Sequence, residues 1–351
     1  MIFVLILASL SFAEQSQSYA FSAGQTLYVE LEQGGNLTII GESRNDLSLE
    51  HHGAEDVVMD VNQTKDGLSV VATLPRNKRH KLAVTIRLPN QANIDVKTTG
   101  GNLQIEQIAG RIEAATMGGN VQLTQLRGEL AVKTMGGNIG IDHSQVSGHV
   151  KTMGGNISLS NTPGLVDCET MGGNINVDNP NSPIDGRVEP VKVKTYGGNI
   201  KVVEAPTGLI GETMGGNINI GSAKFVDVET KGGNIRVDAV DGYATAHTMG
   251  GNITIIMVGD PDDGERDVDL DSKGGDINVH LPAGFSGEFD IEIKQTNDRK
   301  PCKTTSEFAL KQSTEGTRHK VIRASGQTVT GRHRVVIRTV NGDVNIVKTQ
   351  Q

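Results

Sequence analysis

Apolar and polar residues alternate in short stretches along most of the chain, and the pattern recurs with an 18-residue period. After each Gly-Gly-Asn triplet come two apolar residues that are two positions apart, as in Val121 and Leu123 or Ile139 and Ile141. A second alternating stretch, such as residues 130–134, then leads to the next triplet. Side chains two positions apart lie on the same face of a strand, so each repeat predicts two short strands that each bury one face.

The fixed period indicates a repeat architecture. The regular spacing of Gly-Gly pairs is interrupted by two longer intervals, which contain predicted loops at 179–190 and 258–267. Repeats that present two strands in the same order can stack as in-register parallel strands about 4.7–4.9 Å apart. We therefore predict an all-β protein in which residues 94–280 form a single-stranded parallel β-solenoid, with a right-handed coil favoured by general connection rules. The first glycine of each pair lies at positions 100, 118, 136, 154, 172, 197, 215, 232, 250 and 274.

The regions on either side of the array are predicted to be caps. A single coil buries too little apolar surface to fold alone, so stability depends on stacked neighbours and both ends need protection. Residues 14–93 and 281–351 contain further alternating stretches, and we expect β-rich caps there that cover the open strand edges. The triplets Gly34-Gly35-Asn36 and Asn341-Gly342-Asp343 repeat the corner motif within these two regions.

The corner motif itself has a structural interpretation. Two glycines in a row permit positive φ without a Cβ penalty, and we predict that the asparagines form a ladder of stacked side-chain amides. A threonine two residues before nine of these ten Gly-Gly pairs forms a second polar column. The clearest corners are Gly118, Gly119, Asn120, Gly136, Gly137, Asn138, Gly154, Gly155 and Asn156.

The residue directly before each Gly-Gly pair is the most unusual feature of the predicted surface. In-register stacking would align these residues, which are mostly methionines, in one stripe. Three interpretations are open: corner residues that pack flat on their neighbours, which we favour, an adaptable docking surface, or a soft site for Cu(I). Two residues upstream lies a column of charged residues, in which acids and bases mostly pair or alternate as on a solvated face. The candidates for a partner surface are Met117, Met135, Met153, Met171, Tyr196, Met214 and Met249.

Two loops have unusual charge. Asp260, Asp262, Asp263 and Glu265 are dense enough to hold Ca²⁺ through oxygen ligands. Their spacing matches neither an EF-hand loop nor a Gly-Gly-x-Gly-x-Asp repeat, so a plain acidic surface loop is the favoured interpretation. The basic loop 75–81 is interpreted either as a solubilising hairpin tip or as a contact for an anionic glycan or lipid headgroup.

The N-terminal segment 1–13 predicts export. Ile2 to Leu10 form an apolar run that is too short to span a bilayer. Small residues follow at Ser11 and Ala13, as a signal peptidase requires. We therefore expect a signal peptide at residues 1–13 and a periplasmic, cell-surface or secreted protein. No Lys or Arg precedes the apolar run, which is also compatible with a longer natural N-terminus.

Composition narrows the classes of function. A net charge of −8 argues against nucleic acid as a partner, because phosphate binding requires a basic surface. Aromatic residues make up only 3% of the chain and Trp is absent, so the core must be aliphatic and the usual sugar-stacking platform is missing. Cys168 and Cys302 could form a disulfide in an oxidising compartment. Because Cys168 occupies the position of Val132 and Val150, a small buried hydrophobic role is favoured.

Motifs for catalysis are few. The sequence contains no Gly-x-Ser-x-Gly, no His-Glu-x-x-His, no Walker loop and no dinucleotide fingerprint. Carboxylates are plentiful, but no spacing places two of them across a cleft as glycosidases need. No cofactor is implied.

The Gly-Gly-Asn-Ile repeats, the lead-in at residues 82–89 and the closing stretch at residues 338–346 together resemble a bacterial envelope family. It is the β-strand-repeat family described as "putative adhesin", whose members are thought to form β-solenoids at or near the cell surface. The resemblance covers nearly all of the chain after the signal segment, and it brings no catalytic residues. This chain differs in its nearly uniform Gly-Gly-Asn corners and in the methionine before them.

The leading hypothesis is a non-enzymatic exported protein of the cell envelope, an adhesin-like binding protein or scaffold that presents a rigid β-solenoid surface. Its partner would be an envelope or surface protein or glycan, and the absence of a second long apolar run argues against a transmembrane segment. One alternative is a polysaccharide-active β-helix enzyme, a lyase or a hydrolase. Another is a scaffold that self-assembles as a homo-oligomer.

Overall fold

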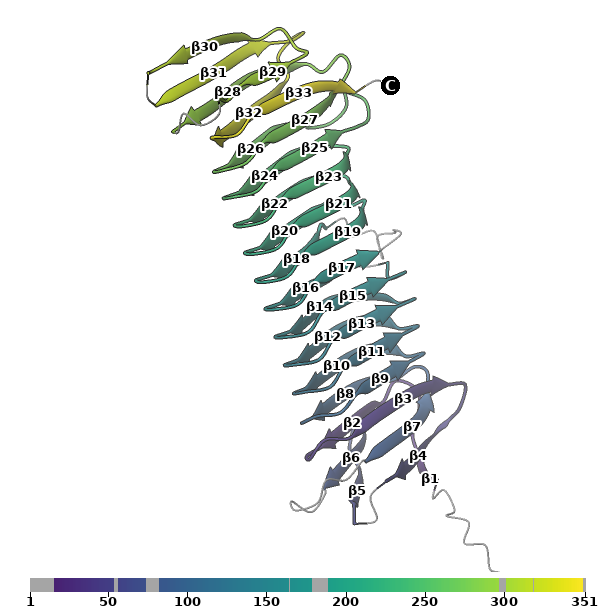
Figure 1. Cartoon of the computed structure of the whole chain (residues 1–351). Helices are drawn as coiled ribbons and strands as arrows, with labels where there is room; N and C mark the ends of the chain where they lie inside the picture. The colour runs from purple at the N-terminus through teal and green to yellow at the C-terminus, as the bar shows by residue number, and fades with distance from the viewer. Residues whose placement is uncertain are drawn as a thin grey trace, which may run out of the picture.

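The computed structural model describes residues 16–53, 56–73, 82–163, 165–178, 189–296, 301–317 and 319–349. Within these residues all regular secondary structure is β-strand, and the strands stack into a straight rod (Figure 1). The all-β solenoid fold predicted from the repeat period is confirmed, and its right-handed coil stays a prediction. In the described part of the chain, no helix is long and apolar enough to cross a membrane. The expected signal segment 1–13, the basic loop 75–81 and residues 179–188 of the first long loop lie outside the described residues.

Two long sheets make up the rod, and each rung contributes one strand to each sheet. In stacking order, sheet A contains β1 (Gln17–Ala20), β4 (Asp46–His52), β7 (Ala83–Pro89), β3 (Asn36–Glu42), β9 (Leu103–Glu106), β11 (Val121–Thr124), β13 (Ile139–Asp142), β15 (Ile157–Ser160), β17 (Ile175–Asp178), β19 (Ile200–Ala205), β21 (Ile218–Ala223), β23 (Ile235–Val240), β25 (Ile253–Met257), β27 (Ile277–Pro282), β33 (Val344–Thr349) and β29 (Thr304–Ser306).

Sheet B does not close into a barrel, because its two edge strands each pair with a neighbour on one side only. Its strands pair in the order β5 (Val58–Gln63), β6 (Gly67–Thr73), β2 (Thr26–Leu31), β8 (Asn93–Thr98), β10 (Ala109–Thr116), β12 (Arg127–Thr134), β14 (Gln145–Thr152), β16 (Val166–Thr170), β18 (Val191–Thr195), β20 (Leu209–Thr213), β22 (Val226–Thr230), β24 (Ala244–Thr248), β26 (Val268–Ser272), β32 (His333–Val340), β28 (Gly287–Gln295), β31 (Lys320–Gln327) and β30 (Lys311–Glu315).

The core is a narrow aliphatic column between the two sheets. Strand residues alternate between buried and exposed, so that Ile175 and Val177 of β17 face Val166 and Cys168 of the preceding strand β16 across the core. Identical or similar side chains lie directly above one another, because each strand pairs in register with the equivalent strand of the next rung. Among the described residues, the buried aromatic side chains lie in the two end regions: Phe21, Phe285, Phe289 and Phe308.

From Thr134 onward, a threonine or serine hydroxyl links each corner of the regular array to the preceding rung. The Oγ1 of Thr152 donates to the carbonyl oxygen of Gly137 in the preceding rung at 2.8 Å and accepts from the N–H of Gly155 in its own rung at 3.2 Å. The side chain is fully buried, so these bonds satisfy two backbone groups that water cannot reach. The same pair of bonds recurs at Thr170, Thr195, Thr213, Thr230, Thr248 and, with serine, at Ser272.

The two glycines of a corner differ in what they require. Neither Gly136 nor Gly137 has a positive φ, so the expected need for left-handed backbone is wrong for these corners. A Cβ on Gly137 would lie 1.9 Å from the carbonyl oxygen of Gly119, whereas a Cβ on Gly136 would meet nothing closer than 3.8 Å. The second glycine is therefore needed because adjacent rungs approach too closely for a side chain, and the first glycine is not sterically required.

The asparagine column also differs from the expectation. Each Asn Oδ1 accepts a hydrogen bond from the backbone N–H of the equivalent residue one rung further, at 2.7–3.1 Å. Among the described residues of this column, one amide–amide bond occurs, from Asn138 Nδ2 to Asn120 Oδ1. Because an acceptor oxygen suffices, aspartate can serve at Asp276, which accepts from the N–H of Asp343 at 2.8 Å.

At both ends the stacking order departs from the chain order. The coil β2–β3 lies between β6–β7 and β8–β9, and the coil β32–β33 lies between β26–β27 and β28–β29. The corners of both coils form hydrogen bonds to the neighbouring rung: the Gly35 N–H donates to Gly100 O at 3.0 Å, and Thr339 Oγ1 donates to Gly275 O at 2.7 Å. The division of the chain at residues 94 and 280 stays a prediction, while the stacking continues past both positions.

Antiparallel strands close the two ends. β1 and β4 extend sheet A and β5 extends sheet B at the N-terminal end, while β31 and β30 extend sheet B at the C-terminal end. The outermost strands of sheet A are short, with four residues in β1 and three in β29. Short edge strands offer little backbone for pairing with another chain, as expected of protective caps.

The asymmetry between the two corner glycines gives a matched test. Gly137→Ala should lower the free energy of unfolding by about 2 kcal/mol or more, because the new methyl group overlaps a backbone carbonyl that has no room to move. Gly136→Ala should change it by no more than about 1 kcal/mol, since the site is open and φ is not positive. Thermal unfolding followed by circular dichroism compares the two, and equal destabilisation would contradict the steric argument.

The threonine hydroxyl can be tested in the same way. Thr152→Val keeps the shape of the side chain but removes both hydrogen bonds, and should cost about 2–4 kcal/mol because buried backbone groups lose their partner. Thr152→Ser keeps the hydroxyl, as at Ser272, and should cost about 1 kcal/mol or less for the lost methyl group. Urea unfolding of the two variants should separate them clearly; similar midpoints would show that the methyl group, and not the hydroxyl, matters.

Candidate functional site

The structure places the seven predicted surface residues in one file at the corner where sheet B turns into sheet A. We call this file, together with Lys231 and Lys273 at the same corner position, the methionine edge. The exposed fractions of the seven side chains range from 38% for Tyr196 to 58% for Met249. The neighbouring threonine of each corner points into the core, so the residue after it must point outward. The seven members are Met117, Met135, Met153, Met171, Tyr196, Met214 and Met249.

A groove of about 420 Å³ follows the N-terminal part of the methionine edge, across β2, β8, β10, β12 and β14. Met117, Met135 and Met153 line one part of it, and the lysines two residues before these corners line another. Ala115 occupies the position of a lysine on its own rung, so its short side chain leaves space between Lys97 and Lys133. The groove is consequently apolar along its length, with three lysines at its rim and two glutamates, Glu30 and Glu32, on the strand at its N-terminal end.

The charged column beside the methionine edge is straight and in register. Lys151 Nζ lies 2.8 Å from Glu169 Oε1, and Lys194 Nζ lies 2.6 Å from Glu212 Oε2. The hydrogen bond that Lys194 donates to Glu212 raises the pKa of Lys194 above its ordinary value. Exposed pairs of this kind contribute little to stability, so the column is better described as a solvated, ordered charge pattern.

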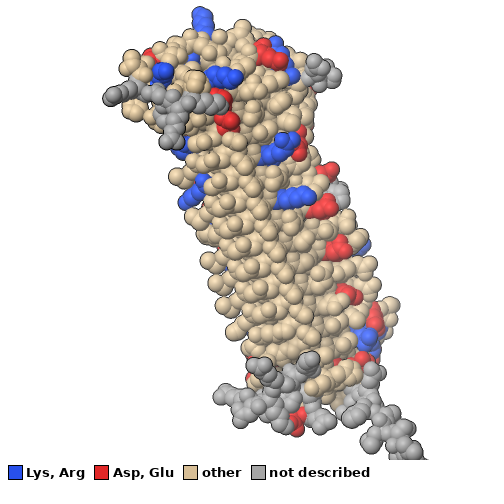
Figure 2. Space-filling model, viewed as in Figure 1, with Lys and Arg blue, Asp and Glu red and all other residues tan. Residues whose placement is uncertain are grey.

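The outer face of sheet A is different. Its outward positions on β11, β15 and β17 are Gln122, Ser158 and Asn176, which are exposed and uncharged. Figure 2 shows a face of the rod with few charged side chains along its middle and acidic residues along one side. At these rungs the outer face of sheet A is thus polar and uncharged, whereas the methionine edge combines apolar and charged side chains.

The acidic loop is organised around a buried arginine. The Arg266 side chain is 1% exposed, and it donates to Val258 O at 2.7 Å, Asp263 O at 2.9 Å and Asp241 Oδ1 at 2.5 Å. Burial raises the pKa of Asp241, but the hydrogen bonds from Arg266 and Lys224 outweigh that effect and lower it. Because Arg266 lies among closely spaced acids in the sequence, its burial was not predicted.

The calcium hypothesis for Asp260, Asp262, Asp263 and Glu265 stays a prediction. In the part of the chain that the structure describes, no three His, Cys, Asp or Glu side chains form a group that could hold a metal ion. Asp260 Oδ1 instead accepts the N–H of Asp262 at 3.0 Å, as in a turn. The guanidinium of Arg266 already supplies positive charge to the loop, so the favoured interpretation as a surface loop fits the contacts better.

The two cysteines lie far apart. Cys168 is buried in β16, and Cys302 lies in the C-terminal cap, next to β29. The seven rungs between β16 and β28 correspond to roughly 34 Å, whereas a disulfide requires Cα atoms within about 7 Å. The two cysteines therefore cannot pair within one chain, and burial raises the pKa of the Cys168 thiol.

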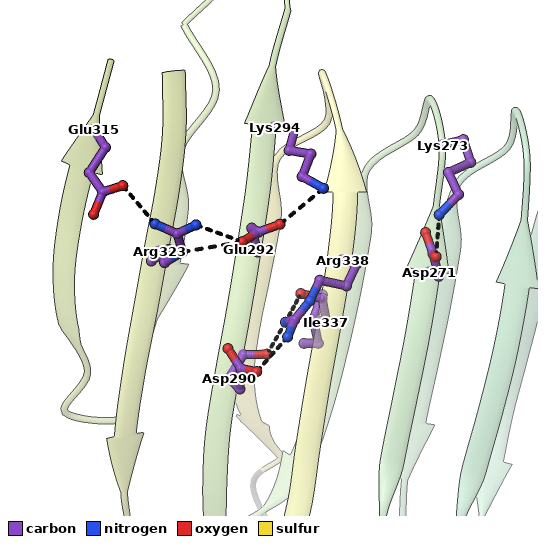
Figure 3. Close-up of polar contacts among 9 residues, drawn as sticks. All are labelled: Asp271, Lys273, Asp290, Glu292, Lys294, Glu315, Arg323, Ile337 and Arg338. Carbon is purple, nitrogen blue, oxygen red and sulfur yellow. Dashed lines mark hydrogen bonds and ion pairs between the residues drawn. The ribbon is translucent and has the colours of Figure 1, made fainter. Parts of the chain in front are cut away.

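Ion pairs cover the outer face of the C-terminal cap (Figure 3). Arg323 of β31 lies 3.1 Å from Glu292 of β28 and 2.9 Å from Glu315 of β30, so it links three antiparallel strands. Arg338 of β32 pairs with Asp290 of the neighbouring strand β28. These groups neutralise one another on an exposed sheet, and we interpret them as the solvated face of the cap.

One hollow on sheet B carries the best candidate for catalysis. Its volume is about 370 Å³, and its lining includes Arg111, His149, Asp167 and Glu189. Burial raises the pKa of Asp167, Glu189 adds to the effect, and Lys192 and His149 oppose it. A general acid benefits from a raised pKa, so this hollow is where the polysaccharide-active alternative can be tested.

Sequence reasoning missed an aromatic stack on the surface of sheet B. The rings of Phe225 and Tyr243 lie 4.7 Å apart, nearly parallel, at equivalent positions of successive rungs. Phe225 in turn lies over Gly208, where a Cβ would come within 2.3 Å of the ring. The spacing of the two aromatics by one repeat period was the available signal, since equivalent positions stack directly in this fold.

The fold and its surfaces define an elongated β-solenoid protein whose most distinctive feature is an apolar, charge-flanked edge. The chain matches the model of the Toastrack DUF4097 family over residues 13–220 and again over residues 212–347, and it belongs to that family. No curated protein matches the chain.

Three solved structures are similar to the chain at low sequence identity. A "putative cell adhesion protein" from Clostridium sporogenes has 8% identity and a TM-score of 0.18, with 96% of this chain and 100% of that chain covered. A "putative adhesin" from Bacteroides fragilis has 12% identity and a TM-score of 0.20, with 96% and 98% covered. A "putative lipid binding protein" from Parabacteroides distasonis has 15% identity and a TM-score of 0.29, with 77% and 97% covered.

The role of Arg266 can be separated from calcium binding. Arg266→Gln should lower the free energy of unfolding by about 2–3 kcal/mol, because it removes an ion pair and leaves two buried carbonyl groups with weaker partners. Addition of calcium should leave the melting temperature of the unmodified protein unchanged. A calcium-dependent rise that Asp262→Asn and Asp263→Asn abolish would restore the metal hypothesis.

Proposed function

We propose that the protein is a non-enzymatic, exported envelope protein that binds a surface or envelope partner through the methionine edge of a rigid rod. The observation that carries the proposal is the file of seven large apolar side chains, each at least 38% exposed, at the corner of an otherwise polar surface. Contiguous exposed apolar surface of this kind is typical of interaction sites. Methionine is well suited to such a surface because its unbranched, polarisable side chain adapts to a partner.

The stiffness of the scaffold supports a docking role. The asparagine hydrogen bonds along the corners, joined from Thr134 onward by the hydroxyl hydrogen bonds, fix each methionine backbone relative to its neighbours. A partner therefore binds a surface whose backbone is already ordered, so little conformational entropy is lost on its side of the contact. Membership of an adhesin-like family agrees with this role.

Export rests on the predicted signal segment 1–13, which agrees with a role at the envelope.

The polysaccharide-active alternative depends on Asp167 and the hollow around it. It requires a second carboxyl group placed across a bound sugar from the first, at a separation that sets the stereochemistry of cleavage. We favour the binding role because the exposed apolar edge extends along most of the solenoid, whereas the hollow covers a few rungs.

Replacing three central methionines tests the docking role. The triple variant Met135→Ala, Met153→Ala and Met171→Ala should weaken capture of the labelled protein by intact cells or envelope fractions about tenfold or more, since buried anchors dominate binding energy. The matched control replaces Gln122, Ser158 and Asn176 by alanine on the outer face of sheet A. Unchanged capture by the methionine variant would sink the proposal, and glycan cleavage that Asp167→Asn abolishes would favour the enzyme.

A further inference from the structure

In the charged column beside the methionine edge, residues at equal distances from the middle of the column carry opposite charges. One position of the column lies on each rung from β2 to β32, and the pairing register fixes their order. Counted inward from the two ends, each charged residue corresponds to one of opposite sign, and the one remaining couple is Ala115 with His247. The order is Glu30, Lys97, Ala115, Lys133, Lys151, Glu169, Lys194, Glu212, Glu229, His247, Asp271 and Arg338.

Such an order is complementary to itself when reversed. A second copy of the chain, rotated about a two-fold axis that crosses the rod between Glu169 and Lys194, would place each charge opposite its complement. Lys133 would face Glu229 of the second copy, and Lys151 would face Glu212. Because every rung has the same spacing of about 4.8 Å in both copies, the correspondence holds along the whole column. The contact would be isologous, as in most homodimers.

We propose that the methionine edge and its charged column bind a second copy of this chain, in an antiparallel two-fold dimer. The inference rests on the proposed docking role of the edge and names its partner: the envelope protein that the edge contacts would be a second copy of this chain. It applies to the edge alone and leaves the outer face of sheet A exposed to other molecules.

The apolar residues agree with the same arrangement. The two-fold axis passes between Met171 and Tyr196, so these side chains would face each other across it. Met153 would face Met214 of the second copy, and Met117 would face Met249. Met135 would face Lys231, whose alkyl stem can cover a methionine while its ammonium group stays in water. The groove along the N-terminal rungs would thus receive the projecting methionines of the C-terminal rungs, and Met249 is the most exposed of these.

The charge order also disfavours the competing arrangements. A parallel pair would bring each charge against its own kind. A shift of one rung in one direction would place Lys151 against Lys194 and Glu169 against its own copy. A shift in the other direction would place Glu169 against Glu212 and Lys194 against its own copy. Specificity therefore comes from repulsion in the alternatives as well as attraction in the proposed register.

The size of the surface is sufficient for a stable dimer. Twelve rungs extend over about 50 Å, and two columns of side chains cover a width of about 15 Å. The contact would bury roughly 800 Å² on each copy, which is the standard size of a specific interface. Its centre would be methionine and tyrosine, with charged pairs alongside, as protein interfaces usually are.

Charge reversal at one couple gives a decisive test. Among the described residues, neither Lys133 nor Glu229 lies within ion-pair distance of an opposite charge in its own chain. Lys133→Glu alone and Glu229→Lys alone should each raise the dissociation constant of the dimer at least about tenfold, because two like-charged contacts appear per dimer. Sedimentation velocity over a range of protein concentrations measures the change. Lys201→Glu, the same reversal on the outer face of sheet A, is the matched control and should have no effect.

Mixing the two single variants separates contact between copies from effects within one chain. In a heterodimer of the two, the carboxylate introduced by Lys133→Glu would face the ammonium group introduced by Glu229→Lys, and the second contact would keep the native Lys133 and Glu229. Association should therefore return in a one-to-one mixture, as it should in the double variant. A protein that stays monomeric at every concentration, or variants that the mixture does not rescue, would overturn the inference.

The two proposals can fail independently. If the unmodified protein is a monomer but the triple methionine variant still loses capture by cells, the docking role stands and the dimer is wrong. If the protein forms the dimer in a charge-dependent way but the methionine variant binds cells normally, the dimer stands and the partner of the envelope contacts another face. Raised salt concentration should weaken the dimer, because exposed charged pairs are screened.

Discussion

The close contact between successive corners is the constraint on which the rest of this structure depends. The second glycine of each corner lies so near the carbonyl oxygen of the rung below that no side chain fits between them. The threonine hydroxyl and the asparagine oxygen then bond the same two rungs on either side of that contact. Three short-range interactions thus define the rung spacing at one edge of the rod, and the strands on both sides follow it. The methionine and charged residues form straight columns because these contacts hold successive corners in line.

The sequence predicted the architecture well because the architecture is repetitive. The fixed period and the alternating apolar pairs are local signals, and their repetition along the array removes ambiguity about strand number and face. The reasons for individual residues were less accessible. Glycine at the corner suggested unusual φ, whereas the actual cause is a contact with another rung, and the sequence does not show the distance between rungs. Asparagine suggested amide stacking, whereas Asp276 and Asp343 indicated from the start that only an acceptor oxygen is needed.

The features that sequence reasoning missed are those set by contacts between unlike parts of the chain. Arg266 stood among acids and was not recognised as the buried group that organises them. The order of rungs at the two ends could not be read from periodicity, because the end coils lack the regular spacing that identifies neighbours. The placement of the exposed file could be predicted, since it required only in-register stacking. Its role depends on what faces it, and a single sequence contains no direct signal for that.

The threading of the last coil has a consequence for how the protein is made. Residues 333–349 form the rung that joins the array to the C-terminal cap, so β28 and β29 cannot reach their final neighbours until those residues are present. A chain that emerges from a ribosome or a translocon N-terminus first could stack its regular rungs as they appear. The top of that growing stack would stay open until residues 333–349 have emerged, because they form the rung that belongs on it. A chain truncated before these residues would therefore carry an exposed strand edge for quality-control proteases to recognise.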